Sequence, residues 1–168
     1  RAGQAPHAGE HILYPETCKN ISPQKRASRM ANGDKYALRL DMKRAIELTG
    51  HSEAPLTWWD NDEMVVATPE KIGDIVLARK DIGTTSYHIS VVHDDYLQGV
   101  SDIVRGVDLL YTTSVHRVLQ ELLGYSTPRY HHHELLVDPE TGFRLAKRDN
   151  PMTIKKLREK GVSPEVVF

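Results

Sequence analysis

The chain of 168 residues is long enough to bury a hydrophobic core without disulfide bonds. Hydrophobic residues make up 39% and charged residues 27%, which is typical of folded proteins and excludes a disordered or fibrous chain. No long apolar run is present, so we expect no membrane span. A single cysteine, Cys18, excludes an internal disulfide bond and favours the reducing cytoplasm.

Basic residues concentrate in two stretches of a chain whose formal net charge is only -1. Residues 19–44 hold eight basic and two acidic residues, and residues 144–160 hold seven basic and two acidic residues. Such zones suit a polyanion, such as a tRNA backbone or a nucleoside triphosphate. Two solvated helix faces would explain the same charges equally well.

In the first half of the chain, glycine and proline separate short elements, and residues 1–18 are expected to be irregular. Ser22 before Pro23 predicts the start of a helix, and Asp41 predicts a second start. The expected elements are a helix over 22–33, a strand over 36–41, a helix over 41–50, and strands over 56–60 and 75–78.

The second half alternates expected strands and helices, which predicts an α/β domain with a largely parallel sheet. The expected elements are strands over 87–92 and 103–105, then helices over 113–123 and 150–161. The helix over 113–123 is supported by the helical spacing of its apolar residues, a cap at Thr112 or Thr113, and Gly124 beyond its end.

Arg105 and Tyr87 form the first candidate site. An arginine beside Gly106 at a strand end suits a carboxylate, because its guanidinium presents a two-pronged set of donors. The Tyr87 hydroxyl would bind an ammonium group or a second carboxylate oxygen. In the alternative, Tyr87 belongs to the core and Arg105 pairs with Asp102 or Asp108.

Residues 142–148 form a second candidate, a loop with three cations that would stabilise developing phosphate charge. Surface loops often carry such cations, so the loop alone is weak support for this role.

Metal binding has two candidate positions. Cys18 is either a small hydrophobic residue or one zinc ligand, with His7 and His11 as nearby candidates. On a strand, His131 and His133 would share one face while His132 points away. Packing and hydrogen bonding are therefore favoured over metal binding for these histidines.

Four blocks of sequence resemble, in order and spacing, the catalytic core of the class I glutamyl-tRNA synthetases. They are GDIVLARKD at 73–81, SYHISVVHDDYLQGVSDIVRGVDLL at 86–110, GYSTPRYHHHELL at 124–136 and FRLAKRD at 143–149. The chain most resembles the glutamyl-queuosine tRNA(Asp) synthetase branch, which lacks an anticodon-binding domain. The full synthetases usually place an acidic residue and a histidine after the Arg-Gly pair, whereas Arg105-Gly106 is followed here by Val107-Asp108-Leu109.

The resemblance implies an α/β fold, the Rossmann-like core of a class I aminoacyl-tRNA synthetase with a small inserted lobe at the N-terminal end. Residues 1–70 would be a zinc-module remnant and a connecting, acceptor-type insertion. Residues 71–168 would be the second half of the core. The first strand and the HIGH-type motif would lie before Arg1, so we expect an incomplete core that is inactive alone. Its exposed sheet edge would favour a dimer.

The resemblance also implies ATP-dependent activation of L-glutamate and its transfer to the queuosine base of tRNA(Asp). Tyr87 and Arg105 match the residues that hold glutamate, and Lys147 matches the lysine that stabilises the phosphate in the reaction. Tyr14 and Cys18 match half of a zinc site. The KMSKS-type loop for ATP falls on Arg144, Leu145, Ala146, Lys147 and Arg148, with alanine where the motif typically has serine.

Two other functions remain open. The chain would instead be a fragment of a glutamyl-tRNA synthetase that charges tRNA(Glu), or a non-catalytic remnant that binds RNA or a partner through its basic zones.

Overall fold

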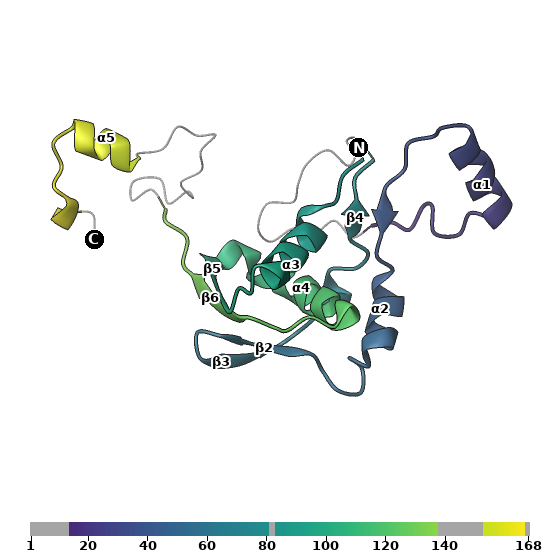
Figure 1. Cartoon of the computed structure of the whole chain (residues 1–168), viewed down its shortest axis with the longest axis horizontal. Coiled ribbons are helices and arrows are strands. Elements are labelled where there is room, and N and C mark those ends of the chain that lie inside the picture. The colour runs from purple at the N-terminus through teal and green to yellow at the C-terminus, as the bar shows by residue number, and fades with distance from the viewer. Residues whose placement is uncertain (1–13, 81–82, 138–152, 167–168) are drawn as a thin grey trace. The chain divides into compact units, whose positions relative to one another are not determined.

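The computed structural model describes residues 14–80, 83–137 and 153–166, and the chain divides into two units (Figure 1). The first unit ends at His132 and the second begins at His133. The helices are α1 (Pro23–Ala31), α2 (Met42–Thr49), α3 (Tyr87–Leu97), α4 (Leu110–Leu123) and α5 (Ile154–Glu159). The strands are β1 (Leu38–Arg39), β2 (Thr57–Asp60), β3 (Glu63–Val66), β4 (Val76–Ala78), β5 (Asp102–Gly106) and β6 (Arg129–His133). Within these ranges, no helix combines the length and the apolar character that crossing a membrane requires.

The first two helices begin where their capping residues predict. The Ser22 hydroxyl accepts a hydrogen bond from the Lys25 N–H at 3.2 Å at the start of α1. The Asp41 carboxylate accepts one from the Arg44 N–H at 3.1 Å at the start of α2. Gly50 ends α2 with a φ of 67°, a left-handed conformation that glycine adopts without a steric cost.

Replacing Asp41 with alanine should lower the free energy of unfolding by about 1 kcal/mol, because α2 loses its N-terminal cap. Asp41 also lies 3.2 Å from the Lys19 ammonium. The matched variant Asp41→Asn keeps a capping oxygen and removes the charge, so it should lose less stability than Asp41→Ala. Urea unfolding of the three proteins checks this, and equal losses in both variants would assign the effect to the ion pair instead.

A four-stranded sheet with the order β3-β2-β6-β5 forms the framework of the first unit. β2 and β6 are parallel, with Asp60 opposite Tyr130, as expected for an α/β domain. β2 and β3 are antiparallel, and β1 pairs with β4 in a separate antiparallel pair. The parallel pairing is important because it places the end of β2 beside β6, although the two strands are far apart in sequence.

The β2–β3 hairpin is an addition to the elements predicted from the sequence. Its turn consists of Asn61 and Asp62, whose φ angles of 48° and 67° are both positive. Asparagine and aspartate tolerate this conformation better than other non-glycine residues, and two such residues in succession suit a tight hairpin. The Asn-Asp pair was therefore a usable signal for β3.

α3 corrects the strand that was predicted over residues 87–92. The alternation of Tyr87, Ile89 and Val91 indicated a strand, but the segment is helical from Tyr87 to Leu97. A helix places Ile89 and Val92 on one face, three residues apart, and both pack into the hydrophobic core. Tertiary packing of that face therefore outweighs the period of two.

α4 begins three residues earlier than its predicted start. A short 3-10 turn, Val107–Leu109, leads into it, so Thr112 and Thr113 lie inside the helix and are not its cap. Both threonine hydroxyls donate to the Leu109 carbonyl, at 2.8 and 3.3 Å. Gly124 ends the helix with a φ of 68°, as predicted.

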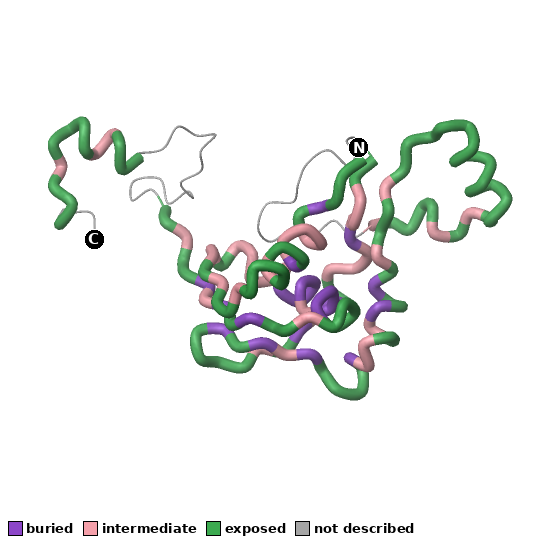
Figure 2. Tube along the Cα trace, viewed as in Figure 1, coloured by how far each residue is buried: buried purple, intermediate pink, exposed green. Residues whose placement is uncertain are grey.

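One hydrophobic core joins α2, α3, α4 and the sheet of the first unit. α2 and α3 both pack against α4, and Figure 2 shows buried segments in α4, α2 and the central strands while α1 is exposed. The core residues are Met42, Ala45, Leu56, Trp58, Ala67, Ile75, Val92, Val115, Val118, Leu119 and Tyr130. They come from both sides of residue 70, and the functional division expected at that position stays a prediction.

The second unit contains the last predicted helix in shorter form. α5 begins after Thr153, whose hydroxyl accepts from the Lys156 N–H at 3.2 Å. The predicted start at Asn150 and Pro151 lies outside the described residues.

Candidate functional site

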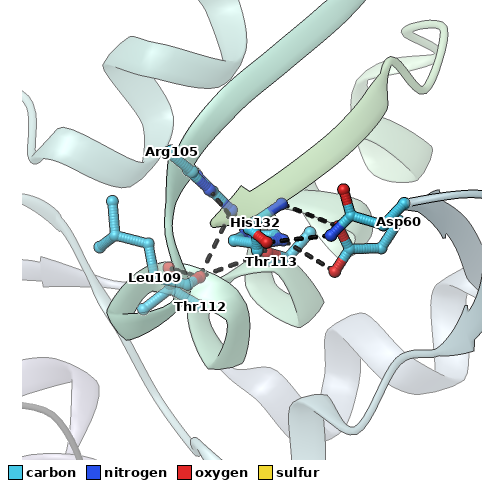
Figure 3. A network of polar contacts seen from close by, with 7 residues as sticks. Asp60, Arg105, Leu109, Thr112, Thr113 and His132 are labelled. Atoms are coloured by element: carbon cyan, nitrogen blue, oxygen red, sulfur yellow. Dashed lines mark hydrogen bonds and ion pairs between the residues drawn. The ribbon is translucent and has the colours of Figure 1, made fainter. Parts of the chain in front are cut away.

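Arg105, near the end of β5, is the centre of a hydrogen-bonded network (Figure 3). Its Nε donates to His132 Nε2 at 3.0 Å, and its Nη1 donates to His116 Nδ1 at 3.2 Å. Its Nη2 donates to the Leu109 carbonyl at 3.4 Å and to the Thr113 hydroxyl. The guanidinium carbon also lies 5.0 Å from the centre of the Tyr130 ring. Five neighbours from β6, the 3-10 turn Val107–Leu109 and α4 therefore fix this side chain.

His132 links Arg105 to Asp60 across the parallel strands. The His132 N–H donates to Asp60 Oδ1 at 3.0 Å, and His132 Nδ1 lies 2.9 Å from Asp60 Oδ2. The Asn61 amide donates to the His132 carbonyl at 2.9 Å. His132 is buried while its two neighbours on β6 are more exposed, so the alternation predicted for the three histidines is confirmed. Its role is in packing and hydrogen bonding, also as predicted.

His116 on α4 and His88 on α3 continue the network on the other side of Arg105. His116 Nε2 lies 3.1 Å from His88 Nδ1, and His116 is only 1% exposed. The ring of Tyr87 lies 5.8 Å from the ring of His116, measured between centroids. Tyr87 and Arg105, the two residues predicted to hold glutamate, thus contact the same histidine.

The surroundings of the three histidines keep them uncharged. Burial lowers the pKa of His116 well below 6.5, and the nearby Arg105 charge lowers it further. Burial also lowers the pKa of His132, although Asp60 opposes the effect. The pKa of His88 is lowered by burial and then by Arg105. Arg105 therefore carries the positive charge of the network at neutral pH.

Acidification should destabilise the first unit before carboxylates titrate. The pKa of His116 is depressed in the folded state, whereas an unfolded histidine titrates near 6.5. The unfolded state therefore binds more protons as the pH falls below that value, and the free energy of unfolding decreases. The loss is at most about 1.4 kcal/mol per pH unit for this ring, until its folded-state pKa is reached.

Urea unfolding at pH 8, 7, 6 and 5.5 measures this dependence. His116→Asn should flatten the decline, whereas His133→Gln, which changes an exposed histidine, should leave it unchanged. A stability that stays constant from pH 8 to 5.5 would contradict a neutral buried His116.

The neighbours of Asp102 and Tyr87 exclude two of the alternatives considered for this site, and a pairing of Arg105 with Asp108 stays open. Asp102 accepts from the Ser101 hydroxyl at 2.7 Å and faces His131 at 3.4 Å, so it is not the partner of Arg105. Tyr87 is 50% exposed and does not belong to the core. Its ring lies beside the network with half of its surface open to solvent.

The four hydrogen bonds of Arg105 limit how it can bind a ligand. A guanidinium has five N–H donors, and four have partners among the residues that the structure describes. The remaining N–H, on Nη1, suits one oxygen of a carboxylate. The two-pronged grip that the sequence suggested would need a second N–H, and it stays a prediction.

Tyr14 and Cys18, the predicted zinc ligands, lie close together. The Tyr14 hydroxyl accepts a hydrogen bond from the Cys18 N–H at 3.0 Å, and the Arg39 guanidinium lies 4.1 Å from the centre of the Tyr14 ring. Among the residues that the structure covers, no group of three histidine, cysteine or acidic side chains can hold a metal ion. His7 and His11 lie outside that range. Tyr14 and Cys18 as half of a zinc site stay a prediction from the sequence, and zinc has no part in the function proposed below.

The predicted ATP loop, Arg144–Arg148 with Lys147, lies outside the described residues. Its role stays a prediction from the sequence.

The sequence analysis missed His88, His116 and Asp60. The available signal was His116 itself, because it stands within the apolar stripe of a predicted buried helix. A polar ring at such a position needs hydrogen-bond partners.

Comparisons with known proteins identify the family. Residues 4–168 match the family model for the catalytic domain of class I tRNA synthetases (E and Q). The glutamyl-Q tRNA(Asp) synthetase of Rhodobacter capsulatus is 42% identical over 95% of this chain and 56% of its own length. That of Nocardia farcinica is 38% identical over 100% of this chain and 50% of its own length. The glutamate–tRNA ligase of Finegoldia magna is 31% identical over 92% of this chain and 30% of its own length.

The chain spans about half the length of the glutamyl-Q relatives that it matches. The resemblance seen in the sequence is confirmed, and so is the fold class, the Rossmann-like catalytic core of a class I synthetase. By the match along nearly its whole length, the chain belongs to the class I tRNA synthetase family for glutamate and glutamine, as part of the catalytic domain.

Proposed function

We propose that the protein containing this chain activates glutamate with ATP in the cytoplasm and transfers it to the queuosine base of tRNA(Asp). The observation that carries the proposal is the position of Arg105, a fixed cation with one N–H left for a carboxylate, beside the half-exposed Tyr87. The relatives with the highest identity reported above are glutamyl-Q tRNA(Asp) synthetases, which supports this acceptor over tRNA(Glu).

Arg105 and Tyr87 would act on the amino acid. The Arg105 Nη1 donates to one carboxylate oxygen of glutamate, and the charge-assisted bond neutralises that group. The Tyr87 hydroxyl binds the ammonium group or a second oxygen. Because Arg105 is fixed by four hydrogen bonds, it loses little side-chain entropy when glutamate binds.

The reaction would proceed in two steps. A carboxylate oxygen of glutamate attacks the α-phosphorus of ATP, the bond to the β-phosphate breaks, and pyrophosphate leaves with the electron pair. A hydroxyl of the queuosine cyclopentene ring then attacks the adenylate carbonyl, loses its proton, and displaces AMP. Lys147 would stabilise the negative charge that develops on the phosphate in the first step.

α1 would contribute to binding the tRNA backbone. The helix buries none of its residues and carries Lys25, Arg26 and Arg29, of which Arg29 is paired with Asp34 at 2.7 Å. Cations on an exposed helix attract phosphates at a distance and make binding dependent on salt.

The intact protein is tested by glutamate-dependent pyrophosphate exchange and by transfer of labelled glutamate to three RNAs. We expect exchange without tRNA, and transfer to tRNA(Asp) that contains queuosine but not to the same tRNA with guanosine. Transfer to tRNA(Glu) would replace the proposal with that of a glutamyl-tRNA synthetase. Salt-sensitive tRNA binding without any exchange would indicate an RNA-binding remnant.

Self-association through the edge strand β5 is also part of the proposal. β5 is the last strand in the order of the described sheet, and Val104 on it is 70% exposed. A second copy of the strand would pair with its edge and lie beside this side chain. Sedimentation should therefore detect a dimer that Val104→Lys dissociates, whereas a monomer at micromolar concentrations would contradict this.

A further inference from the structure

The hydrogen bonds of Arg105 determine which nitrogen of each neighbouring histidine carries a proton. A guanidinium only donates, so the atoms facing it must accept. His116 Nδ1 at 3.2 Å and His132 Nε2 at 3.0 Å are therefore both unprotonated. Neutral histidine carries its proton on the other nitrogen, so His116 holds it on Nε2 and His132 on Nδ1.

These two tautomers extend the chain of donors outward in both directions. The proton on His132 Nδ1 points to Asp60 Oδ2 at 2.9 Å. The proton on His116 Nε2 points to His88 Nδ1 at 3.1 Å, which makes His88 the acceptor and leaves its own proton on Nε2. In every bond of this network the donor lies on the Arg105 side and the acceptor lies farther out. The network joins five side chains from five elements: Asp60, His88, Arg105, His116 and His132.

Within this hydrogen-bonded network, the acceptor that His116 offers to Arg105 Nη1 is not easily replaced by another group. His116 is 1% exposed, so water does not reach Arg105 from its side. Thr113 and Leu109 accept only from Nη2, whereas Nη1 also carries the N–H left for a ligand. Because the guanidinium is planar, the acceptors on Nε, Nη1 and Nη2 together set the direction in which that remaining N–H points, and His116 is the acceptor on the same nitrogen.

We propose that His116 is a positioning residue: as an uncharged acceptor with its proton fixed on Nε2 by His88, it aims the free N–H of Arg105 at the glutamate carboxylate. This inference rests on the function proposed above for Arg105. The contribution of His116 is through Arg105, without contact with the reacting atoms.

The tautomers are measured directly by side-chain 15N NMR of the histidines in the wild-type protein at pH 7. We expect His116 and His88 protonated on Nε2 alone, and His132 protonated on Nδ1 alone. A His116 protonated on Nδ1, or on both nitrogens, would overturn the proposal. This readout requires neither a variant nor any activity.

Two variants of His116 separate positioning from packing. The oxygen of asparagine falls near the Nδ1 position of histidine, so His116→Asn keeps an acceptor for Arg105. The amide of glutamine reaches the Nε2 position, so His116→Gln keeps the contact with His88 and withdraws the acceptor. Calorimetric titration with glutamate should show an affinity within about twofold of wild type for His116→Asn and roughly tenfold weaker for His116→Gln.

The outcomes distinguish this inference from the proposed function. If both variants lose the same amount of glutamate affinity, His116 only fills space, and the proposed positioning role is wrong. If both variants are unstable, the NMR tautomers decide. If the wild-type protein does not bind glutamate at all, the proposed function fails and this inference fails with it, whereas binding that is indifferent to His116→Gln overturns the inference alone.

Discussion

Replacing Arg105 with alanine should weaken glutamate binding by about 1.5–3 kcal/mol, which is roughly a 10- to 150-fold loss of affinity. The variant removes the cation that faces the carboxylate. It also leaves His132 Nε2, His116 Nδ1 and the Thr113 hydroxyl without their donor in a buried region. Some loss of stability should therefore accompany the loss of affinity.

Calorimetric titration of the intact protein with glutamate measures this effect, and urea unfolding shows how much of the protein is folded. Arg105→Lys keeps the charge but offers three N–H donors without the planar fork that serves four acceptors, so it should recover only part of the affinity. Arg129→Ala removes an exposed arginine of the neighbouring strand and serves as the matched control. An unchanged affinity in Arg105→Ala would refute its assignment to glutamate.

Replacing Lys147 with alanine should slow adenylate formation about 100- to 1000-fold, the cost of removing one group that stabilises developing charge. Glutamate affinity should stay nearly unchanged, because the lysine acts on phosphate that is charged most strongly in the transition state. Pyrophosphate exchange at saturating glutamate gives the rate, and titration with glutamate gives the affinity.

Lys155 provides the control for this variant. It is an exposed lysine of α5, 3.9 Å from Glu159, and Lys155→Ala should leave the rate unaltered. If Lys147→Ala behaves in the same way, the loop over residues 144–148 is a surface feature and ATP is held elsewhere.

Local signals in the sequence were sufficient for the elements that have clear ends. Ser22 and Asp41 cap the first two helices, and Gly50 and Gly124 end α2 and α4, because these residues satisfy backbone groups or adopt positive φ angles. α3 was missed although Ser86, a residue type that favours a helix N-cap, precedes it, because its apolar residues also fit a period of two. Only packing against α4 reveals which of the two patterns the chain follows.

The candidate site was predictable in its chemistry but not in its contacts. Arg105 and Tyr87 were identifiable as residue types suited to an amino acid, and a family resemblance supported them. That His116 would connect them was not predictable, because α3, α4 and β5 meet only in the folded chain. The contact of His132 with Asp60 was not predictable for the same reason, because Asp60 lies 72 residues away in the sequence.

The contact between Asp60 and His132 has a consequence for how the site forms. A pair separated by 72 residues is made only after a long loop has closed, so the arginine cannot be held until β2 and β6 have met. We expect the site to assemble late in folding and to open as one unit. Glutamate would then slow hydrogen exchange of the backbone amides in β2 and β6, far along the chain from the arginine that it binds.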